Sequence, residues 1–134
     1  MQHKKKIIIS ANSAWNIVNF RKGIVLKFID NGFEVVIVST MDEHVSRLYE
    51  FGCQHININI DSKGMNPIND LYLIFQYLKI FNKIKPNIIL TYTVKPNIYG
   101  SIAASFYSIP VVNNISGLGT AFIKGGLLGK IVSF

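Results

Sequence analysis

The residues best suited to contact a ligand fall in three short segments of the chain. The first is SANSAWNIVNFRKG, in which Asn12 and Ser13 offer hydrogen bonds, Trp15 offers a stacking face and Arg21 offers a positive charge. A dinucleotide-binding loop would carry GxGxxG here, so that backbone amides can approach a pyrophosphate, and that motif is absent. We interpret this segment as a polar and aromatic loop, Ala11–Asn19, followed by a helix with Arg21 in its first turn. A cation there opposes the helix dipole, which suits a residue that faces an anionic ligand.

The other two segments are TYTVKPNIYG and SGLGTAF. Lys95 stands just before a proline that opens a predicted helix, and an amine beside a helix N-terminus suits phosphate or carboxylate. Asn97 could cap that helix or bind a ligand. Gly117 and Gly119 permit close approach of the backbone, or simply a tight turn, and Thr120 follows them with a hydroxyl group. A lysine in a turn and a glycine in a turn are also ordinary structural features, so both readings stay open.

Motifs for metal or acid–base chemistry are missing from the sequence. It contains no DxD pair to hold a divalent metal and no Cys/His cluster with zinc spacing. We therefore predict no metal and assign no catalytic residue. His44 follows a predicted strand but is expected on the surface.

The segments that hold these residues alternate between strand and helix patterns. Strands are predicted at 6–10, 33–40, 54–60, 87–93 and 110–116, and helices at 20–31, 42–51, 67–85 and 96–107. The strand at 54–60 alternates polar and apolar residues, which indicates a place near the sheet edge. In the helix at 67–85, Gln76, Lys79 and Lys83 form one narrow polar stripe, so most of its surface is expected to be covered.

This alternation predicts an α/β fold, a Rossmann-like parallel sheet with helices on both faces and strand order 3-2-1-4-5. Ligands bind beyond the carboxyl ends of such strands, where the strand order reverses. That point lies between strands one and four, and the three segments above converge there.

Composition limits the classes of protein that fit. The chain has 134 residues, 49% of them hydrophobic, enough for one folded domain. Its net charge is +7, and residues 71–134 carry six lysines and no acid. Such a basic half suggests an anionic partner: phospholipid headgroups, a lipid-linked diphosphate or nucleic acid. The single Cys53 fits a packing role in a reducing compartment, and no apolar run reaches the roughly 18 residues of a transmembrane helix.

Two stretches carry a family resemblance: PNIILTYTVKPNIYGSIAA and IPVVNNISGLGTAF resemble the amino-terminal domain of glycosyltransferase family 4. NFRKGIVLKFIDNGFEVVIVS and MNPINDLYLIFQYLKIFNKIKP are similar to the branch that builds capsule, O-antigen (lipopolysaccharide) or lipid-linked oligosaccharides. Many family members carry histidines where this sequence has Leu90 and Tyr92, so no histidine role is expected there.

The resemblance implies the amino-terminal half of a GT-B enzyme, with two Rossmann-like domains facing across a cleft. It further implies a retaining transfer without metal or cofactor, from a nucleotide-sugar donor whose own phosphate helps to take the acceptor proton. The implied acceptor is a polyprenyl-diphosphate-linked saccharide at the cytoplasmic face of the inner membrane, with peripheral contact to anionic lipid and no nucleic acid. Acceptor-site roles carry over to Arg21, Lys95, Asn97, Gly117 and Gly119.

On this interpretation residues 1–134 are the acceptor-side domain, the sequence ends before the donor-binding domain and its E-x7-E pattern, and the chain alone is expected to be inactive. The alternative is a non-catalytic fragment, or a split-enzyme subunit that needs a partner chain for the donor site. A nucleotide-binding oxidoreductase or epimerase is the weakest reading, because the first loop lacks the glycine signature.

Overall fold

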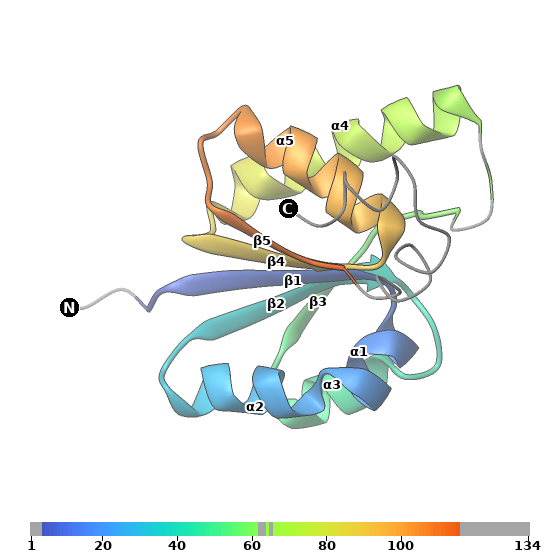
Figure 1. Cartoon of the computed structure of the whole chain (residues 1–134). Helices are drawn as coiled ribbons and strands as arrows, with labels where there is room; N and C mark the ends of the chain where they lie inside the picture. Colours follow the sequence, from blue (N-terminus) through green and yellow to red (C-terminus); the bar gives the residue numbers. More distant parts are fainter. Residues whose placement is uncertain (1–3, 62–63, 65, 116–134) are drawn as a thin grey trace, which may run out of the picture.

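The structure of the protein is a computed structural model, and it describes residues 4–61, 64 and 66–115. Five strands alternate with helices in the order predicted from the sequence (Figure 1). The strands are β1 (Lys6–Ser13), β2 (Glu34–Thr40), β3 (Gln54–Asn57), β4 (Ile88–Tyr92) and β5 (Val111–Asn114). The helices are α1 (Ala14–Phe20), α2 (Lys22–Asp30), α3 (Val45–Phe51), α4 (Pro67–Ile84) and α5 (Ser101–Ser105), with a π-helical turn η1 (Pro96–Gly100) before α5.

All strand pairs are parallel, and the order across the sheet is β3-β2-β1-β4-β5. The Rossmann-like α/β fold and the strand order expected from the sequence are therefore confirmed. The strand at 54–60 is indeed an edge strand, although it is shorter than predicted.

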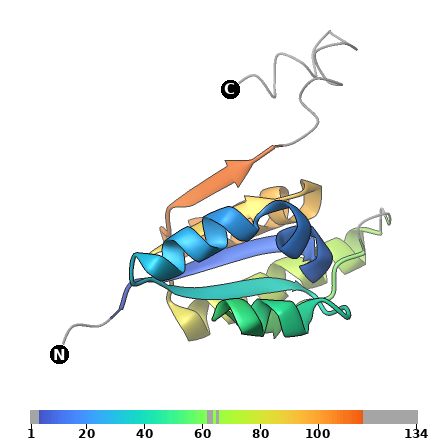
Figure 2. The same ribbon diagram turned by 90° about the horizontal axis from the view of Figure 1, so that it is seen from below.

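Helices cover both faces of the sheet. In Figure 1, α1, α2 and α3 lie below the sheet and α4 and α5 lie above it; Figure 2 shows the lower layer in front of the strands. Side chains alternate between the two layers, as a pleated strand requires. Ile7 and Ile9 of β1 pack toward the lower layer, whereas Ile8 packs toward α4 and α5. The free Cys53 is buried in the lower core, in agreement with a packing role.

A buried hydrogen-bond relay joins α4 to the central strands. The hydroxyl of Ser10 lies 2.7 Å from the Val38 carbonyl oxygen and 2.7 Å from the Tyr77 hydroxyl. Ser10 has one proton and donates it to the carbonyl, so Tyr77 donates to Ser10. Burial raises the pKa of Tyr77 and keeps it a donor.

The first predicted loop is not a loop. Residues 11–13 continue β1 past an irregularity in register, and Ala14 begins α1. Ser13 caps this helix, because its Oγ accepts from the Asn16 amide at 3.2 Å, and Ala14 and Ile17 bury one face of it. The helical spacing of Ala14 and Ile17 is too short to stand out among the polar residues of this segment, and for that reason we predicted a loop.

Arg21 does not lie in the first turn of one long helix. Its backbone (φ −123°, ψ 10°) breaks the helical path, so that it ends α1 and precedes α2. A cation is favourable at the end of α1 and unfavourable at the start of α2, so the expected helix-dipole penalty is largely offset.

The expectation that α4 is covered over most of its surface was wrong. Four large side chains on its outward face are exposed: Ile68 (77%), Leu71 (55%), Tyr72 (57%) and Phe75 (59%). We call these four residues the α4 apolar stripe. Their spacing of i, i+3, i+4 and i+7 is that of one helical face, and the opposite face already packs on the sheet through Leu73, Tyr77 and Phe81. The sequence pattern showed two apolar faces but not which of them the sheet would bury.

Candidate functional site

The centre of the candidate site is the point where β1 and β4 separate. These adjacent strands lead to helices on opposite faces of the sheet, and in folds of this kind ligands bind beyond the carboxyl ends of such strands. The Asn12 amide donates to Thr93 Oγ1 at 3.2 Å and ties the two strand ends together. Thr93 has a φ of 69°, a left-handed conformation that a β-branched residue rarely adopts. Strained backbone of this kind gathers at functional sites because the surroundings must hold it in place.

Arg21 reaches the same place from the junction of α1 and α2. Its guanidinium carbon lies 4.3 Å from the centre of the Tyr92 ring, which forms a cation–π contact. Arg21 Nε is buried and has no hydrogen-bond partner, and Arg21 makes no ion pair with any described residue. Burial raises the pKa of the Tyr92 hydroxyl, while the nearby Arg21 charge opposes that shift. Arg21 is therefore positioned by Tyr92 near the carboxyl ends of the central strands, and its charge is not paired with a described carboxylate.

Ser13 and Trp15 take different positions. The Ser13 side chain is occupied by the α1 cap, which accounts for it structurally. Trp15 donates its backbone amide to Asp42 Oδ2 at 2.9 Å and packs edge-on against Phe20, with ring centres 5.3 Å apart. Trp15 is still 46% exposed, so part of its aromatic surface stays open to solvent.

Lys95 lies on the α4 side of the sheet and is paired with a carboxylate. Its Nζ is 2.9 Å from Asp70 Oδ1, and the Tyr99 hydroxyl donates to Asp70 Oδ2 at 2.9 Å. The side chains of Lys95 and Asp70 are only 12% and 19% exposed. The hydrogen bonds from Lys95 and Tyr99 hold the pKa of Asp70 below its usual value, and the Asp70 carboxylate raises the pKa of Tyr99. Lys95 is thus not an isolated cation.

A pocket of about 400 Å³ lies beside this pair. Polar groups, Ile60 and two large side chains of α4 form its wall. The lining residues are Thr40, Asn59, Ile60, Asp61, Asn69, Asp70, Tyr72, Leu73 and Lys95. Thr40 ends β2 and Lys95 follows β4, so the pocket opens at the same edge of the sheet as Arg21.

Asn97 belongs to a polar network between β4 and β5. Thr91 Oγ1 is 2.6 Å from both Asn97 Oδ1 and Asn113 Oδ1, and Asn97 Nδ2 donates to the Asn114 carbonyl oxygen at 3.0 Å. Ser101 Oγ lies 2.6 Å from the Asn97 carbonyl oxygen and 2.8 Å from Asn113 Oδ1. Each hydroxyl has one proton and can donate one hydrogen bond. Thr91 and Ser101 therefore donate to Asn97 and accept from Asn113, whose amide nitrogen faces both hydroxyls. Asn97 then orders the π-helical turn that follows β4.

The structure therefore brings Asn12, Arg21 and the β4 end together, whereas Lys95 and Asn97 occupy two neighbouring clusters at the same edge. Gly117, Gly119 and Thr120 lie outside the described residues. From the sequence we did not single out Asp70, which lies in the first turn of α4, or Thr93, whose positive φ cannot be predicted from a local pattern. No group of three or more His, Cys, Asp or Glu side chains in the described ranges could hold a metal ion.

Two comparisons with known protein sequences point to glycosyltransferases. The family described as "Glycosyl transferase 4-like" matches residues 6–132. An N,N'-diacetylbacillosaminyl-diphospho-undecaprenol alpha-1,3-N-acetylgalactosaminyltransferase of Campylobacter jejuni is 27% identical over 120 residues, covering 89% of this chain and 32% of that protein.

Two solved structures share the fold. A glycosyltransferase from Rickettsia africae superposes with a TM-score of 0.65 at 20% identity, covering 96% of this chain and 35% of that one. A UDP-N-acetylglucosamine 2-epimerase gives a TM-score of 0.67 at 18% identity, covering 96% and 39%. The fold is thus shared by transferases and epimerases and does not separate them. The chain spans about a third of the length of each of these three proteins.

Proposed function

The chain belongs to the glycosyl transferase 4-like family, and from that premise we propose that it forms the acceptor-side half of a retaining enzyme. The enzyme moves a sugar from a nucleotide-sugar donor to a saccharide carried on a polyprenyl diphosphate, in synthesis of a bacterial surface polysaccharide such as capsule or lipopolysaccharide. The name of the Campylobacter jejuni relative includes a diphospho-undecaprenol, which supports this class of acceptor.

The observation that carries the proposal is Arg21. A diphosphate bears negative charge that a guanidinium can bind in a bidentate manner. Arg21 is held over Tyr92 at the strand-order reversal with one buried nitrogen unpartnered and no described carboxylate beside it. It therefore keeps its charge available for an anion, while Asn12 and Trp15 supply a hydrogen-bonding and a stacking group nearby.

The roles we assign to this half are binding and orientation. The carboxylate of Asp70 is tied to Lys95 and Tyr99, and we assign no general base among the described residues. The proposed donor is bound by a second domain, and the reaction uses neither metal nor cofactor. The alternative is a split-enzyme subunit or a non-catalytic fragment, in which the donor site comes from a partner chain or is lacking.

The proposed location is the cytoplasmic face of the inner membrane, with peripheral contact to anionic lipid. Ile68, Leu71 and Phe75 of the α4 apolar stripe are exposed. Lys79 and Lys83 continue the same helix face toward its end. Apolar side chains next to lysines are the features of a helix that lies in a membrane interface. No helix within the described ranges is long and apolar enough to cross a bilayer.

A transfer assay with the full-length protein tests the proposal. We expect label to pass from one of a panel of sugar nucleotides to a synthetic polyprenyl-diphosphate saccharide, and addition of a chelator to leave the rate unchanged. Absence of transfer across the panel, together with absence of donor binding, would contradict the enzymatic proposal and favour the fragment. Transfer that appears only after a second chain is added would identify a split enzyme.

A further inference from the structure

The pocket beside Asp70 has a chemistry that the Arg21 site does not share. Its lining contains two carboxylates, Asp61 and Asp70, and one ammonium, Lys95, which is already paired with Asp70. A diphosphate would meet the Asp70 carboxylate there, and the Lys95 ammonium is already paired with it, whereas Arg21 forms no ion pair with a described residue. The two places at this edge of the sheet therefore suit different parts of a substrate.

The remaining groups in the pocket fit a neutral polyhydroxylated ring. Asp70 accepts one hydrogen bond on each carboxylate oxygen, so each oxygen keeps a lone pair for a hydroxyl donor. The side-chain amides of Asn59 and Asn69 form no hydrogen bond with a described residue, although both line the pocket. Amides both donate and accept, as sugar hydroxyls do.

The apolar part of the wall completes the match. Tyr72 lines the pocket from α4 and remains 57% exposed, so its ring offers a flat surface for the CH face of a pyranose. The pocket volume of about 400 Å³ falls within the roughly 300–1,000 Å³ that is usual for small-molecule sites. Lys95 and Tyr99 fix the Asp70 carboxylate in place before any ligand arrives, which lowers the cost of ordering it.

We propose that this pocket binds one pyranosyl unit of a substrate through its hydroxyl groups, with Asp70 as the main acceptor and Tyr72 as the stacking surface. The proposal rests on the proposed function, because it takes the sugar from the acceptor or the donor of that reaction. It adds a saccharide site on the α4 side of the sheet to the diphosphate site at Arg21.

Direct binding tests the pocket without relying on catalysis. We expect saturation-transfer NMR of the full-length protein with methyl glycosides of N-acetylgalactosamine, galactose and glucose to show binding of at least one, with inorganic phosphate unable to displace it. Asp70→Asn and Tyr72→Ala should each weaken that binding by about tenfold or more. Asp30→Asn, at the exposed end of α2, is the matched control and should leave binding unchanged. Tyr72→Ala leaves the Lys95 pair intact, so it tests the pocket even if Asp70→Asn perturbs folding.

Steady-state kinetics then identify which sugar occupies the pocket. A rise in the acceptor KM in Asp70→Asn, with the donor KM unchanged, assigns the acceptor sugar, and the reverse assigns the donor sugar. Glycoside binding that requires Asp70 in a protein without transfer activity would uphold the pocket while the proposed reaction fails. No glycoside binding by the wild type, or equal binding by wild type and both pocket variants, would overturn the inference.

Discussion

At the residue scale, the site depends on how single charges are partnered. Arg21 and Lys95 were both singled out from the sequence as candidate anion ligands. In the structure Lys95 is 2.9 Å from a carboxylate, whereas the Arg21 guanidinium lies over the face of an aromatic ring and forms no ion pair with a described residue. A cation–π contact leaves the positive charge uncompensated, and an ion pair does not. We therefore rank Arg21 first for binding a diphosphate.

Replacing Arg21 should impair use of the acceptor. In the full-length protein we expect Arg21→Gln to raise the acceptor KM about tenfold or more, since one charge-assisted contact is worth roughly 1.5–3 kcal/mol. The donor KM should stay the same. Arg47→Gln is the matched control, because Arg47 is exposed on α3 and pairs with Glu50 at 3.3 Å. Equal acceptor KM values in both variants would remove Arg21 from the site.

The thiol of Cys53 should be unreactive in the folded protein. Burial raises its pKa to about 11, so the thiolate that reacts with iodoacetamide is scarce at pH 8. We expect peptide mass spectrometry to show Cys53 unlabelled under native conditions and fully labelled in denaturant. Rapid native labelling at pH 8 would show that the lower core opens readily.

At the element scale, α4 is the helix that most affects the site. Its buried face closes the upper core, its first turns supply Asp70 and Tyr72, and its outward face carries the apolar stripe. The Tyr77 hydroxyl ties this helix to β1 through its hydrogen bond with Ser10. The helix thus connects the sheet, the pocket and the exposed surface.

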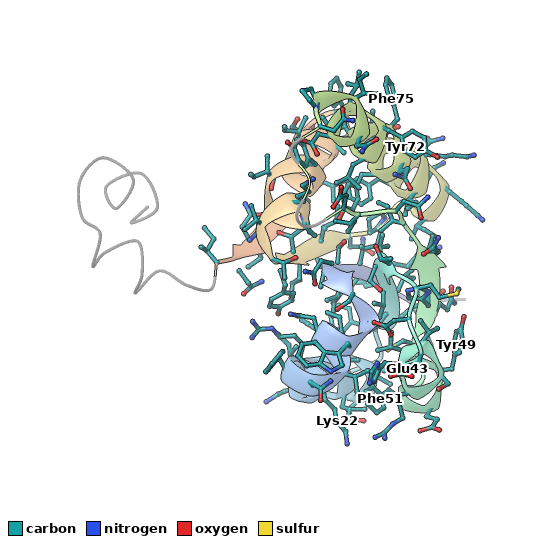
Figure 3. The ribbon with its side chains drawn as sticks, turned by 90° about the vertical axis from the view of Figure 1, so that its right-hand side faces the viewer. Lys22, Glu43, Tyr49, Phe51, Tyr72 and Phe75 are labelled. Carbon is teal, nitrogen blue, oxygen red and sulfur yellow. The ribbon has the colours of Figure 1, made fainter. Side chains whose placement is uncertain are left out.

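Removal of the Tyr77 hydroxyl should weaken this packing. We expect Tyr77→Phe to lower the free energy of unfolding by about 1 kcal/mol, because the Ser10 oxygen loses its donor in a dry environment. Urea denaturation measures the change. Tyr49→Phe, at an exposed position on α3 (Figure 3), should change stability by only a few tenths of a kcal/mol. Equal effects in the two variants would show that the relay contributes nothing.

The Asp70–Lys95 pair should make stability depend on acid. The folded pKa of Asp70 lies below its usual 3.8, so the folded state binds fewer protons than the unfolded state between the two values. Its contribution is therefore complete above about pH 5 and is lost as the pH falls through the lowered pKa. Urea midpoints of wild type and Asp70→Asn should differ at neutral pH and converge as the pH falls below the lowered folded pKa of Asp70. A difference that does not vary with pH would argue against the pair.

At the scale of the whole molecule, the two helical layers present different surfaces. Figure 3 shows Tyr72 and Phe75 on the outward side of α4, at the opposite end of the molecule from Tyr49 and Lys22. Contiguous exposed apolar side chains are uncommon on monomeric proteins and mark surfaces that meet a partner or a membrane. The stripe and the pocket both lie at the first turns of α4. This arrangement fits the proposed acceptor, whose lipid would stay in the bilayer while its sugar reaches the pocket.

Vesicle binding tests this arrangement. We expect the full-length protein to bind vesicles that contain anionic lipid more tightly than purely zwitterionic ones, and salt to reduce the difference, because lysines near the surface contribute roughly 1 kcal/mol each. Leu71→Ser with Phe75→Ser should weaken binding to both vesicle types, whereas Lys79→Gln with Lys83→Gln should weaken binding to the anionic vesicles only. Tyr49→Ser, on the opposite layer, is the control. Unchanged binding in both pairs of variants would place the membrane contact elsewhere.

The sequence by itself determined the local and periodic features of this protein. Apolar runs separated by helical patterns specify a parallel sheet, and right-handed connections leave few strand orders, so β3-β2-β1-β4-β5 could be predicted. The reversal of that order indicated where a ligand would bind, and the polar residues after the first strand led us to expect Asn12 and Arg21 there. The fold could be predicted because each strand and helix is specified by residues a few positions apart, whereas the ligand roles of Asn12 and Arg21 stay predictions.

Only the tertiary structure decided which groups are partnered and which surfaces are open. Asp70 and Lys95 are 25 residues apart, and no local pattern shows that they form a pair. Both faces of α4 carry large apolar side chains, and no local pattern shows that the sheet buries the face with Leu73, Tyr77 and Phe81. The positive φ of Thr93 also follows no local sequence pattern, and it lies where the Asn12 amide joins the ends of β1 and β4. Charge, exposure and strain at the site are set by groups distant in the chain, and for that reason the sequence alone did not reveal them.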